Sequence, residues 1–300
     1  RYEEDTDSMW NVDTQVRYYA GEDGTFRSEE GERLTVGWRV HVGFDNFTRA
    51  FTDNNYAGPL AKITVWTFVF AIITVLSSFF LGLVLAVVFN DRRMKGQKVI
   101  RSFFLLPYAF PAFMSGLLWR GMLNSDPDYG IINHLFFFDT YIQWLSDPWL
   151  AKLAIIMVNL WLSFPYWFLV CVGALQSVPE DIQESARIDG AGRLRIWRSI
   201  TLPILLVSTA PLLIASFAFN FNNFTIIYML TNGGPRFSDT SAALGHTDIL
   251  ISMIYRISGM TGEGVVDYGF ASALSLIVFL LVGVVSALAF RQTRRLEEMM

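Results

Sequence analysis

Residues 179–203 read PEDIQESARIDGAGRLRIWRSITLP, and this polar stretch between two long hydrophobic runs decides how the rest of the chain is interpreted. Pro179 is typical of the start of a helix, whereas Gly190 and Gly192 predict a turn before a second short helix over 194–200. The stretch also contains apolar residues that a merely solvated loop would not need: Ile182, Ala186, Ile188, Leu194, Ile196 and Trp197. We therefore expect it to dock into a groove of a partner protein.

The composition predicts a membrane protein. Hydrophobic residues make up 53% of the chain, and five stretches lack Asp, Glu, Lys and Arg: 63–90, 102–119, 153–179, 199–235 and 268–290. A membrane-spanning helix needs about 20 mostly apolar residues. We predict an all-α polytopic membrane protein with five transmembrane helices. The second should be kinked by Pro107 and Pro111, and the fourth should run as one helix over 202–230.

Basic residues in the short loops predict the orientation. Five lie in 91–101, four in the 179–203 loop and three after Phe290, whereas 121–152 and 236–267 hold one and two. Because short cytoplasmic loops are enriched in Lys and Arg, the three basic segments are expected in the cytoplasm. The N-terminal segment is then outside the cell membrane and the C-terminus inside.

Residues 1–58 are soluble in character. Alternating apolar residues over 34–42 predict a half-buried strand, and Asp45 predicts the cap of a short helix. The chain begins at Arg1 with no signal peptide or span before this segment, so we expect it to be the C-terminal portion of a longer protein. Residues 1–58 would be the end of an extracytoplasmic domain, and 59–300 the transmembrane domain.

Two polar stripes within the predicted spans are candidates for ligand binding. Each follows one helical face and combines amide, hydroxyl and aromatic groups: Asn159, Leu162, Ser163 and Tyr166 in the third span, and Ser216, Phe219, Asn220 and Asn223 in the fourth. Amides donate to and accept from hydroxyls, and rings cover the apolar faces of a pyranose, so the stripes suit a neutral sugar. The alternative is that the asparagines bond helices together, each bond contributing about 0.6 to 2 kcal/mol.

Several absences narrow the class of protein. No G-x-x-x-x-G-K-[ST] loop is present, so the chain is not expected to hydrolyse ATP. The single Cys171 offers no cysteine metal cluster, and no Asp, Glu, Lys, Arg or His lies inside a predicted span. The polar loop residues His246, Asp248, Asp126 and Asp128 are interpreted as solvated.

The segment ESARIDGAG (184–192), followed by ITLP (200–203), resembles the EAA loop of ABC importer permeases. Ser185 stands where many members have Ala. The resemblance implies a type I ABC importer permease fold, with 179–203 forming a cytoplasmic coupling helix that sits in a cleft of the ATPase subunit. The implied ATPase-coupling residues are Glu184, Ala186, Asp189 and Gly190.

Four further segments resemble the MalF-type permease subunits of maltose importers: 36–53, NLWLSFPY (159–166), ASFAFNFNNF (215–224) and LTNGGP (230–235). The resemblance implies sugar contacts at Asn159, Leu162, Ser163, Tyr166, Ser216, Phe219, Asn220 and Asn223. Ser163 replaces a glycine of the family pattern. The implied substrate is maltose, maltodextrin or a related disaccharide.

The same resemblance implies a transporter pore subunit of a bacterial inner membrane rather than an enzyme. It implies no cofactor in this chain, because ATP and Mg²⁺ would bind the partner ATPase. The expected partners are a second permease subunit, an ATPase dimer, a periplasmic sugar-binding protein and membrane lipid, with no nucleic acid. Two other classes of protein are alternatives. A gradient-driven secondary sugar transporter would also use the polar stripes but would not explain the apolar residues of the 179–203 loop, and a membrane glycosyl enzyme would need an acid pair that the spans lack.

Overall fold

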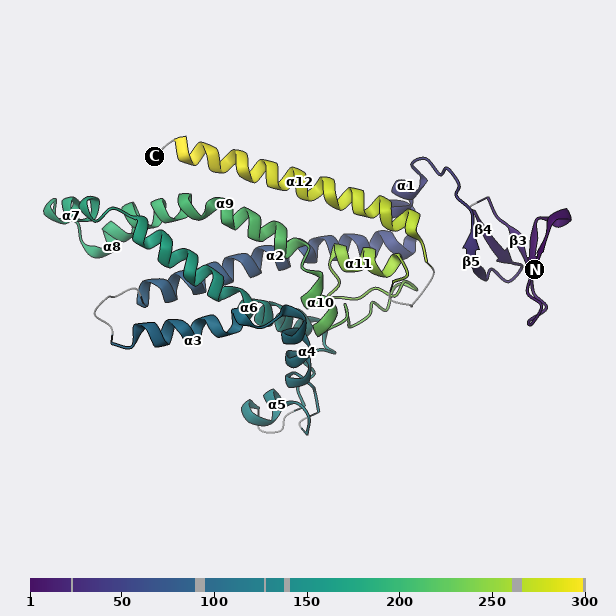
Figure 1. The fold of residues 1–300 in the computed structure, drawn as a ribbon, viewed down its shortest axis with the longest axis horizontal. Helices are drawn as coiled ribbons and strands as arrows, with labels where there is room; N and C mark the ends of the chain where they lie inside the picture. The colour runs from purple at the N-terminus through teal and green to yellow at the C-terminus, as the bar shows by residue number, and fades with distance from the viewer. Residues whose placement is uncertain (23, 90–94, 127, 138–140, 261–265, 299–300) are drawn as a thin grey trace.

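The computed structural model describes residues 1–300 apart from 23, 90–94, 127, 138–140, 261–265 and 299–300. Within these residues, four helices are long and apolar enough to cross a membrane, and a bent pair of shorter helices makes up to five. The long helices are α2 (Asn54–Val88), α6 (Pro148–Ser177), α9 (Leu202–Phe221) and α12 (Tyr268–Glu298). All four run lengthwise along the molecule in Figure 1, and α6 crosses α2 obliquely. The predicted all-α polytopic architecture is confirmed.

The second predicted span is a broken helix. Its halves, α3 (Gln97–Ala109) and α4 (Ala112–Met122), meet at an angle of 92°. Phe110 and Pro111 between them have extended backbone, with ψ of 132° and 133°. A residue before proline is pushed out of the helical region, and proline itself cannot donate a backbone bond, so the predicted kink occurs here as a sharp turn.

The fourth span differs from the predicted single helix over 202–230. The helix α9 ends at Phe221, and α10 (Phe224–Leu230) follows after a break at Asn222 and Asn223. Asn222 bonds through its side-chain amide to the carbonyl of Ala218, one turn back. Asparagine competes in this way for backbone partners, which explains why the helix stops at this pair.

At its other end, α9 begins earlier than Pro203. The short helix α8 (Arg193–Ile196) continues through a π-turn, η2 (Trp197–Thr201), directly into α9. The N–H of Leu202 donates to the carbonyl of Trp197, five residues back. Because Pro203 has no N–H, the turn before it widens without the helix breaking. One helical rod therefore runs from Arg193 to Phe221.

The core lies where α2 crosses α6. A Cβ placed on Gly82 of α2 would lie 2.6 Å from the backbone nitrogen of Phe168, so only glycine permits this approach. About 44% of the most apolar window of α2 and of α6 is buried, against 11% for the helix that contains α9 and 17% for α12. The last two helices thus keep large apolar faces uncovered.

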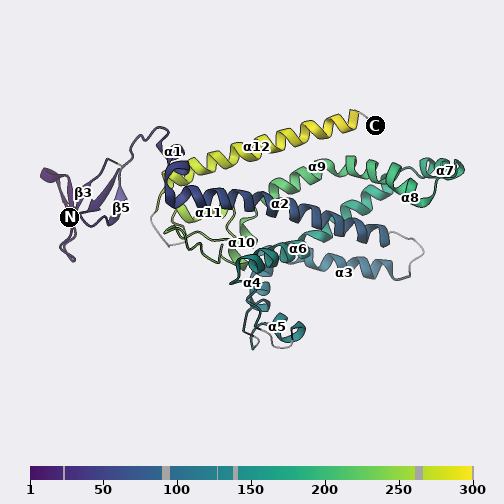
Figure 2. The same ribbon diagram turned by 180° about the vertical axis from the view of Figure 1, so that it is seen from behind.

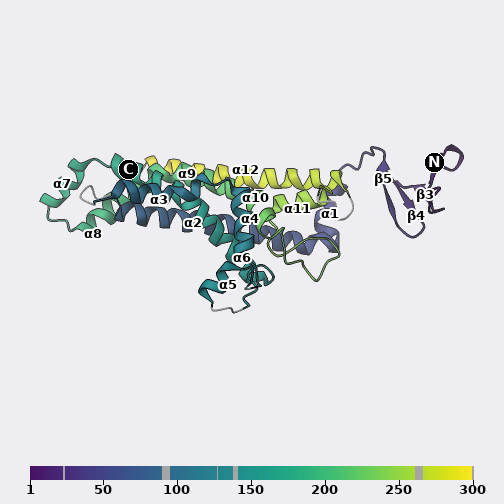
Figure 3. The ribbon, with the colours of Figure 1, turned by 60° about the horizontal axis from the view of Figure 1, so that its bottom comes forward.

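Shorter elements flank the helices at both ends. The helices α5 (Ile131–Phe136) and α11 (Leu250–Ile257) lie in the α4–α6 and α10–α12 connections, and α5 stands away from the other helices in Figures 1–3. The helix α7 (Glu180–Ile188), within the loop 179–203, lies at the end opposite the N-terminus in each view.

An antiparallel five-stranded sheet precedes the helices. Its strands pair in chain order: β1 (Tyr2–Glu3), β2 (Ser8–Trp10), β3 (Arg17–Ala20), β4 (Thr25–Ser28) and β5 (Arg33–Gly37), with a 3-10 turn, η1 (Glu4–Thr6), between the first two. The strand predicted over 34–42 ends at Gly37, because its partner β4 begins opposite it at Thr25. The predicted short helix is α1 (Asp45–Thr52), in which Asp45 is the first helical residue and Phe44 takes the cap position.

Candidate functional site

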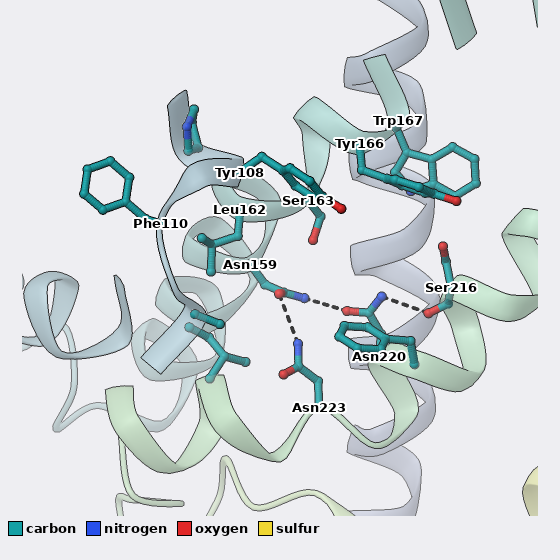
Figure 4. Close-up of a pocket in the computed structure, with 14 residues that line it drawn as sticks. Tyr108, Phe110, Asn159, Leu162, Ser163, Tyr166, Trp167, Ser216, Asn220 and Asn223 are labelled. Atoms are coloured by element: carbon teal, nitrogen blue, oxygen red, sulfur yellow. Dashed lines mark hydrogen bonds between the residues drawn. The ribbon is translucent and has the colours of Figure 1, made fainter. Parts of the chain in front are cut away.

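All eight residues of the two predicted stripes line one cavity of about 370 Å³ (Figure 4). The cavity lies where the α3–α4 break and the α9–α10 break meet α6. Its lining contains no charged side chain and consists of Pro107, Tyr108, Phe110, Ala112, Asn159, Leu162, Ser163, Tyr166, Trp167, Ser216, Phe219, Asn220, Asn223 and Ile226. Cavities of this size at discontinuous helices are typical of ligand sites in transport proteins.

Three asparagines form a hydrogen-bonded network across the cavity (Figure 4). Asn159 Nδ2 donates to Asn220 Oδ1 at 2.7 Å, and Asn223 Nδ2 donates to Asn159 Oδ1 at 3.2 Å. Asn220 Nδ2 in turn donates to the carbonyl of Ser216 at 2.9 Å. Asn159 and Asn220 are only 3% and 5% exposed. The network therefore joins α6 to α9 and to the start of α10, and it holds three amides in fixed orientations.

Asn223 reaches the cavity by a different route from the one predicted. The helical spacing placed it on one face with Ser216, Phe219 and Asn220, but it lies beyond the end of α9 and caps α10. The break at Asn222 turns the chain, and the side chain of Asn223 still points at Asn159. The predicted membership of the lining holds, whereas the predicted single helical face does not.

The hydroxyl groups of the lining are available for a ligand. Within the described part of the chain, the side-chain hydroxyls of Ser163, Tyr166 and Ser216 make no hydrogen bond to protein. Phe219 is 70% exposed at the edge of the cavity. Polar groups in an apolar segment need hydrogen-bond partners, so these hydroxyls suit a polar ligand.

Sequence reasoning missed part of the lining. Tyr108 and Phe110 enter it because Pro107 and Pro111 break the second span beside them. The sequence shows the two prolines, but it does not show that the break they cause faces the cavity. Trp167 is 1% exposed and packs edge to face against Phe79, while also lining the cavity.

The loop 179–203 forms an exposed helix, a turn and the start of the α8–α9 rod. Its apolar residues divide into two groups. Ile182, Ile188 and Leu194 are 45%, 86% and 78% exposed, whereas Ile196 is buried and Trp197 packs against the core beside it. Ile196 and Trp197 thus anchor the loop on the core, whereas Ile182, Ile188 and Leu194 remain exposed.

The turn after α7 gives the loop a fixed shape. Gly190 has φ of +82°, a conformation that favours glycine. The N–H of Asp189 donates to the carbonyl of Ser185, and the N–H of Ala191 to that of Ala186. Glu184 and Asp189 are exposed, and Ala186 is half-buried. The four predicted coupling residues therefore lie together on the largely exposed helix α7 and the turn that follows it.

The interpretation of Asp248 as a solvated loop residue is wrong. Its side chain is fully buried and forms an ion pair with Arg256, with 3.2 Å between Oδ1 and Nε. The loop folds back on α11, which brings together two residues eight positions apart. His246 is half-buried against the ring of Phe237. Asp126 and Asp128 do belong to a surface turn, in which the N–H of Asp128 donates to Asp126 Oδ1.

The comparisons with known proteins identify the family. The family model for the binding-protein-dependent transport system inner membrane component matches residues 78–298, and the chain belongs to this family. Membership makes it a membrane component of a transport system rather than an enzyme. The resemblance to ABC importer permeases is thereby confirmed.

Particular relatives are maltose/maltodextrin transport system permease proteins MalF. The chain is 42% identical over 286 residues to that of Vibrio vulnificus (strain YJ016), covering 95% of this chain and 54% of the relative. It is 42% identical over 265 residues to that of Escherichia coli (strain K12), covering 88% and 51%. The chain thus spans about half the length of the curated relatives it matches.

Solved structures share the fold. A bacterial ABC transporter involved in the import of the acidic polysaccharide alginate superimposes with a TM-score of 0.71 at 22% identity, covering 86% of this chain and 85% of that one. An amino acid ABC transporter crystallised with histidines gives a TM-score of 0.55 at 17% identity, covering 85% and 100%. At these identities the likeness concerns the fold alone.

Proposed function

We propose that this chain supplies the membrane-spanning pore of an ATP-driven importer for a neutral sugar, with maltose or maltodextrin as the first choice. The observation that carries the proposal is the cavity between α6, α9 and the two helix breaks, where amides, hydroxyls and rings converge without a charged side chain. The names of the MalF relatives support the particular sugar.

The lining favours a neutral substrate over an ionic one. An acidic sugar, such as the alginate named for the structural neighbour, would call for a cationic partner in the site. The described lining has none. Each amide has donor or acceptor positions that the network does not use. Asn159, Asn220 and Asn223 are therefore able to bind sugar hydroxyls without breaking the hydrogen bonds between them.

The coupling loop would carry ATP-driven motion to this cavity. Its exposed apolar residues Ile182, Ile188 and Leu194 suit a groove of a separate ATPase, which would bind ATP and Mg²⁺. The loop continues into the unbroken rod from Arg193 to Phe221. Because Ser216, Phe219 and Asn220 lie on that rod, a displacement of the loop would reach the sugar contacts directly.

Glu184 is the proposed polar contact of the loop. It is exposed on α7 and would pair with a basic residue of the ATPase subunit, while Ala186, Asp189 and Gly190 shape the helix end around it. The loop would thus combine an apolar anchor with one charged contact.

The same assembly would need further partners. The sparsely buried faces of α9 and α12 suit a second permease subunit and lipid, and a soluble sugar-binding protein would deliver the substrate. We place the basic loops and the C-terminus in the cytoplasm of a bacterium with the chain in its inner membrane. Residues 1–58, with the sheet, would end a periplasmic domain, and 59–300 would form the permease domain.

Energy dependence separates this proposal from a gradient-driven transporter. The complete importer would be reconstituted in proteoliposomes, and uptake of radiolabelled maltose would be measured with ATP, without ATP, and with ATP plus an ionophore that collapses ion gradients. The proposal predicts uptake that requires ATP and survives the ionophore. Uptake that needs no ATP and is abolished by the ionophore would overturn it.

A further inference from the structure

A buried polar cluster joins the loop after α10 to α11. The side chains of Asp248 and Arg256 are 0% and 4% exposed and form the 3.2 Å ion pair. Asp248 Oδ1 also accepts from Ser252 Oγ at 2.7 Å, and Oδ2 accepts from the backbone N–H of Gly245 at 2.8 Å. Both carboxylate oxygens are thus engaged by protein donors, as a buried charge requires.

The cluster holds the C-terminal end of α10. Arg256 Nη2 donates to the backbone carbonyl of Asn232 and, at 2.9 Å, to its side-chain Oδ1. Asn232 lies two residues beyond Leu230, the last residue of α10. Gly233 packs so closely that a Cβ there would lie 2.2 Å from Asp248 Oδ1. Directional bonds therefore fix the chain immediately after α10.

The other end of α10 forms a wall of the sugar cavity. Asn223 caps the helix and Ile226 lies in its first turn, and both line the cavity. At 1.5 Å per residue, this seven-residue helix is only about 10 Å long. Its inner face, Ile226, Ile227 and Leu230, is fully buried. Apolar burial is non-directional, so it does not by itself set the rotation of so short a helix.

We infer that Asp248 and Arg256 are positioning residues for the sugar site. The pair fixes the rotation and axial position of α10 and thereby directs Asn223 at Asn159, 3.2 Å away. Neither residue lines the cavity, so the effect passes through α10. A buried ion pair is a weak device for stability but an effective one for selecting a single arrangement. For the identity of the ligand, this inference rests on the proposed function.

A double-mutant cycle tests the inference. Equilibrium binding of radiolabelled maltose to the purified complete importer, without the soluble binding protein, would be compared for wild type, Asp248→Asn, Asn223→Ala and the double variant. Asp248→Asn keeps the shape and removes the charge. We expect Asp248→Asn to weaken maltose binding about tenfold when it is the only substitution. In the Asn223→Ala background it should weaken binding at most about twofold, because the contact of Asn223 with the sugar is already lost.

The matched control is a second ion pair, which joins Asp239 of the same loop to Lys62 of α2. Lys62 and Asp239 lie 2.5 Å apart but are both more than half exposed. Asp239→Asn should leave maltose affinity unchanged, because exposed pairs contribute little and this one does not reach α10. If Asp248→Asn fails to assemble, Arg256→Lys retains the charge without the forked donor and should show a smaller loss with the same non-additivity.

Two results would overturn the inference: a folded Asp248→Asn complex with wild-type maltose affinity, or losses from Asp248→Asn and Asn223→Ala that multiply in full. A wild-type complex that binds no maltose would contradict the proposed function instead. The positioning is then measured without sugar, from the yield of disulfide cross-linking in an Asn159→Cys/Asn223→Cys variant. Asp248→Asn should lower that yield, and an unchanged yield would contradict the inference.

Discussion

The two interpretations of the membrane asparagines, sugar contact and interhelical bond, are compatible at Asn159. Its amide joins α6 to α9 through Asn220, and the same amide faces the cavity. The helical spacing placed seven of the eight lining side chains on the faces they occupy, whereas Asn223 reaches the cavity from beyond the end of α9. The spacing was not enough to predict Tyr108 or Phe110, which depend on how a broken helix turns in space.

Tyr166 offers a clean test of sugar contact against packing. Its hydroxyl has no protein partner within the described chain, so Tyr166→Phe should leave the thermal unfolding midpoint unchanged. Maltose affinity of the complete importer should fall about three- to tenfold, the effect of one net hydrogen bond. Unchanged affinity combined with lower stability would show that the hydroxyl serves the protein rather than the sugar.

His246 should make the loop between α10 and α11 sensitive to acid. Burial lowers the pKa of His246 from its ordinary 6.5, and the positive charges of Lys152 and Lys62 lower it further. Below about pH 6.5 the unfolded chain therefore binds a proton that the folded chain does not, and the free energy of unfolding decreases as the pH falls. Unfolding midpoints measured from pH 7.5 to 5 should show this slope in the wild type and a shallower one in His246→Gln. Identical slopes would contradict the assignment.

Among the helices, the sequence predicted one of the two breaks and missed the other. The sequence predicted the broken second span from Pro107 and Pro111, since proline acts locally. It did not predict the break at Asn222, because asparagine ends a helix only where its side chain finds a backbone partner. The ion pair of Asp248 with Arg256 was missed for a similar reason: pairing depends on how the loop closes on α11.

The α2–α6 crossing should depend on Gly82. Gly82→Ala would place a Cβ 2.6 Å from the backbone nitrogen of Phe168 and should lower the free energy of unfolding by about 1–3 kcal/mol. Gly173 on the crossing partner α6 has no atom within 4 Å of such a Cβ, apart from its chain neighbours and the adjacent backbone of its own helix. The control Gly173→Ala should be neutral or stabilise by up to about 1 kcal/mol, as helix propensity favours alanine. Denaturant unfolding of the purified protein gives both values, and equal effects would refute the account of the crossing.

The exposed apolar side of the coupling loop should be needed for ATPase binding. Ile188→Asp places a charge on a side chain that is 86% exposed, so the spans should fold normally. Co-purification of the ATPase subunit should be lost, because the groove would have to bury the carboxylate. Leu135 on α5 is also exposed, at 62%, and Leu135→Asp should leave co-purification intact. Retention of the ATPase by the Ile188→Asp protein would show that the loop docks elsewhere.

At the scale of the whole molecule, the chain has the form of a subunit. The sheet and the coupling loop lie at opposite ends, and the cavity lies between them on the breaks of two spans (Figures 1 and 4). The rod from Arg193 to Phe221 connects the loop to the cavity, while α9 and α12 keep apolar faces that this chain does not cover. Composition predicted the spans well because hydrophobicity is a local property. The uncovered faces emerge only once the helices are packed.

Whether the asparagine-lined cavity is the sugar site would be decided by a structure of the complete importer trapped with maltose. We expect sugar density in the cavity between α6 and α9, within hydrogen-bonding distance of Asn159, Ser163 and Asn220, and α7 seated against the ATPase subunit. Sugar density at another place in the pore, with the asparagine network intact and its cavity empty, would contradict it.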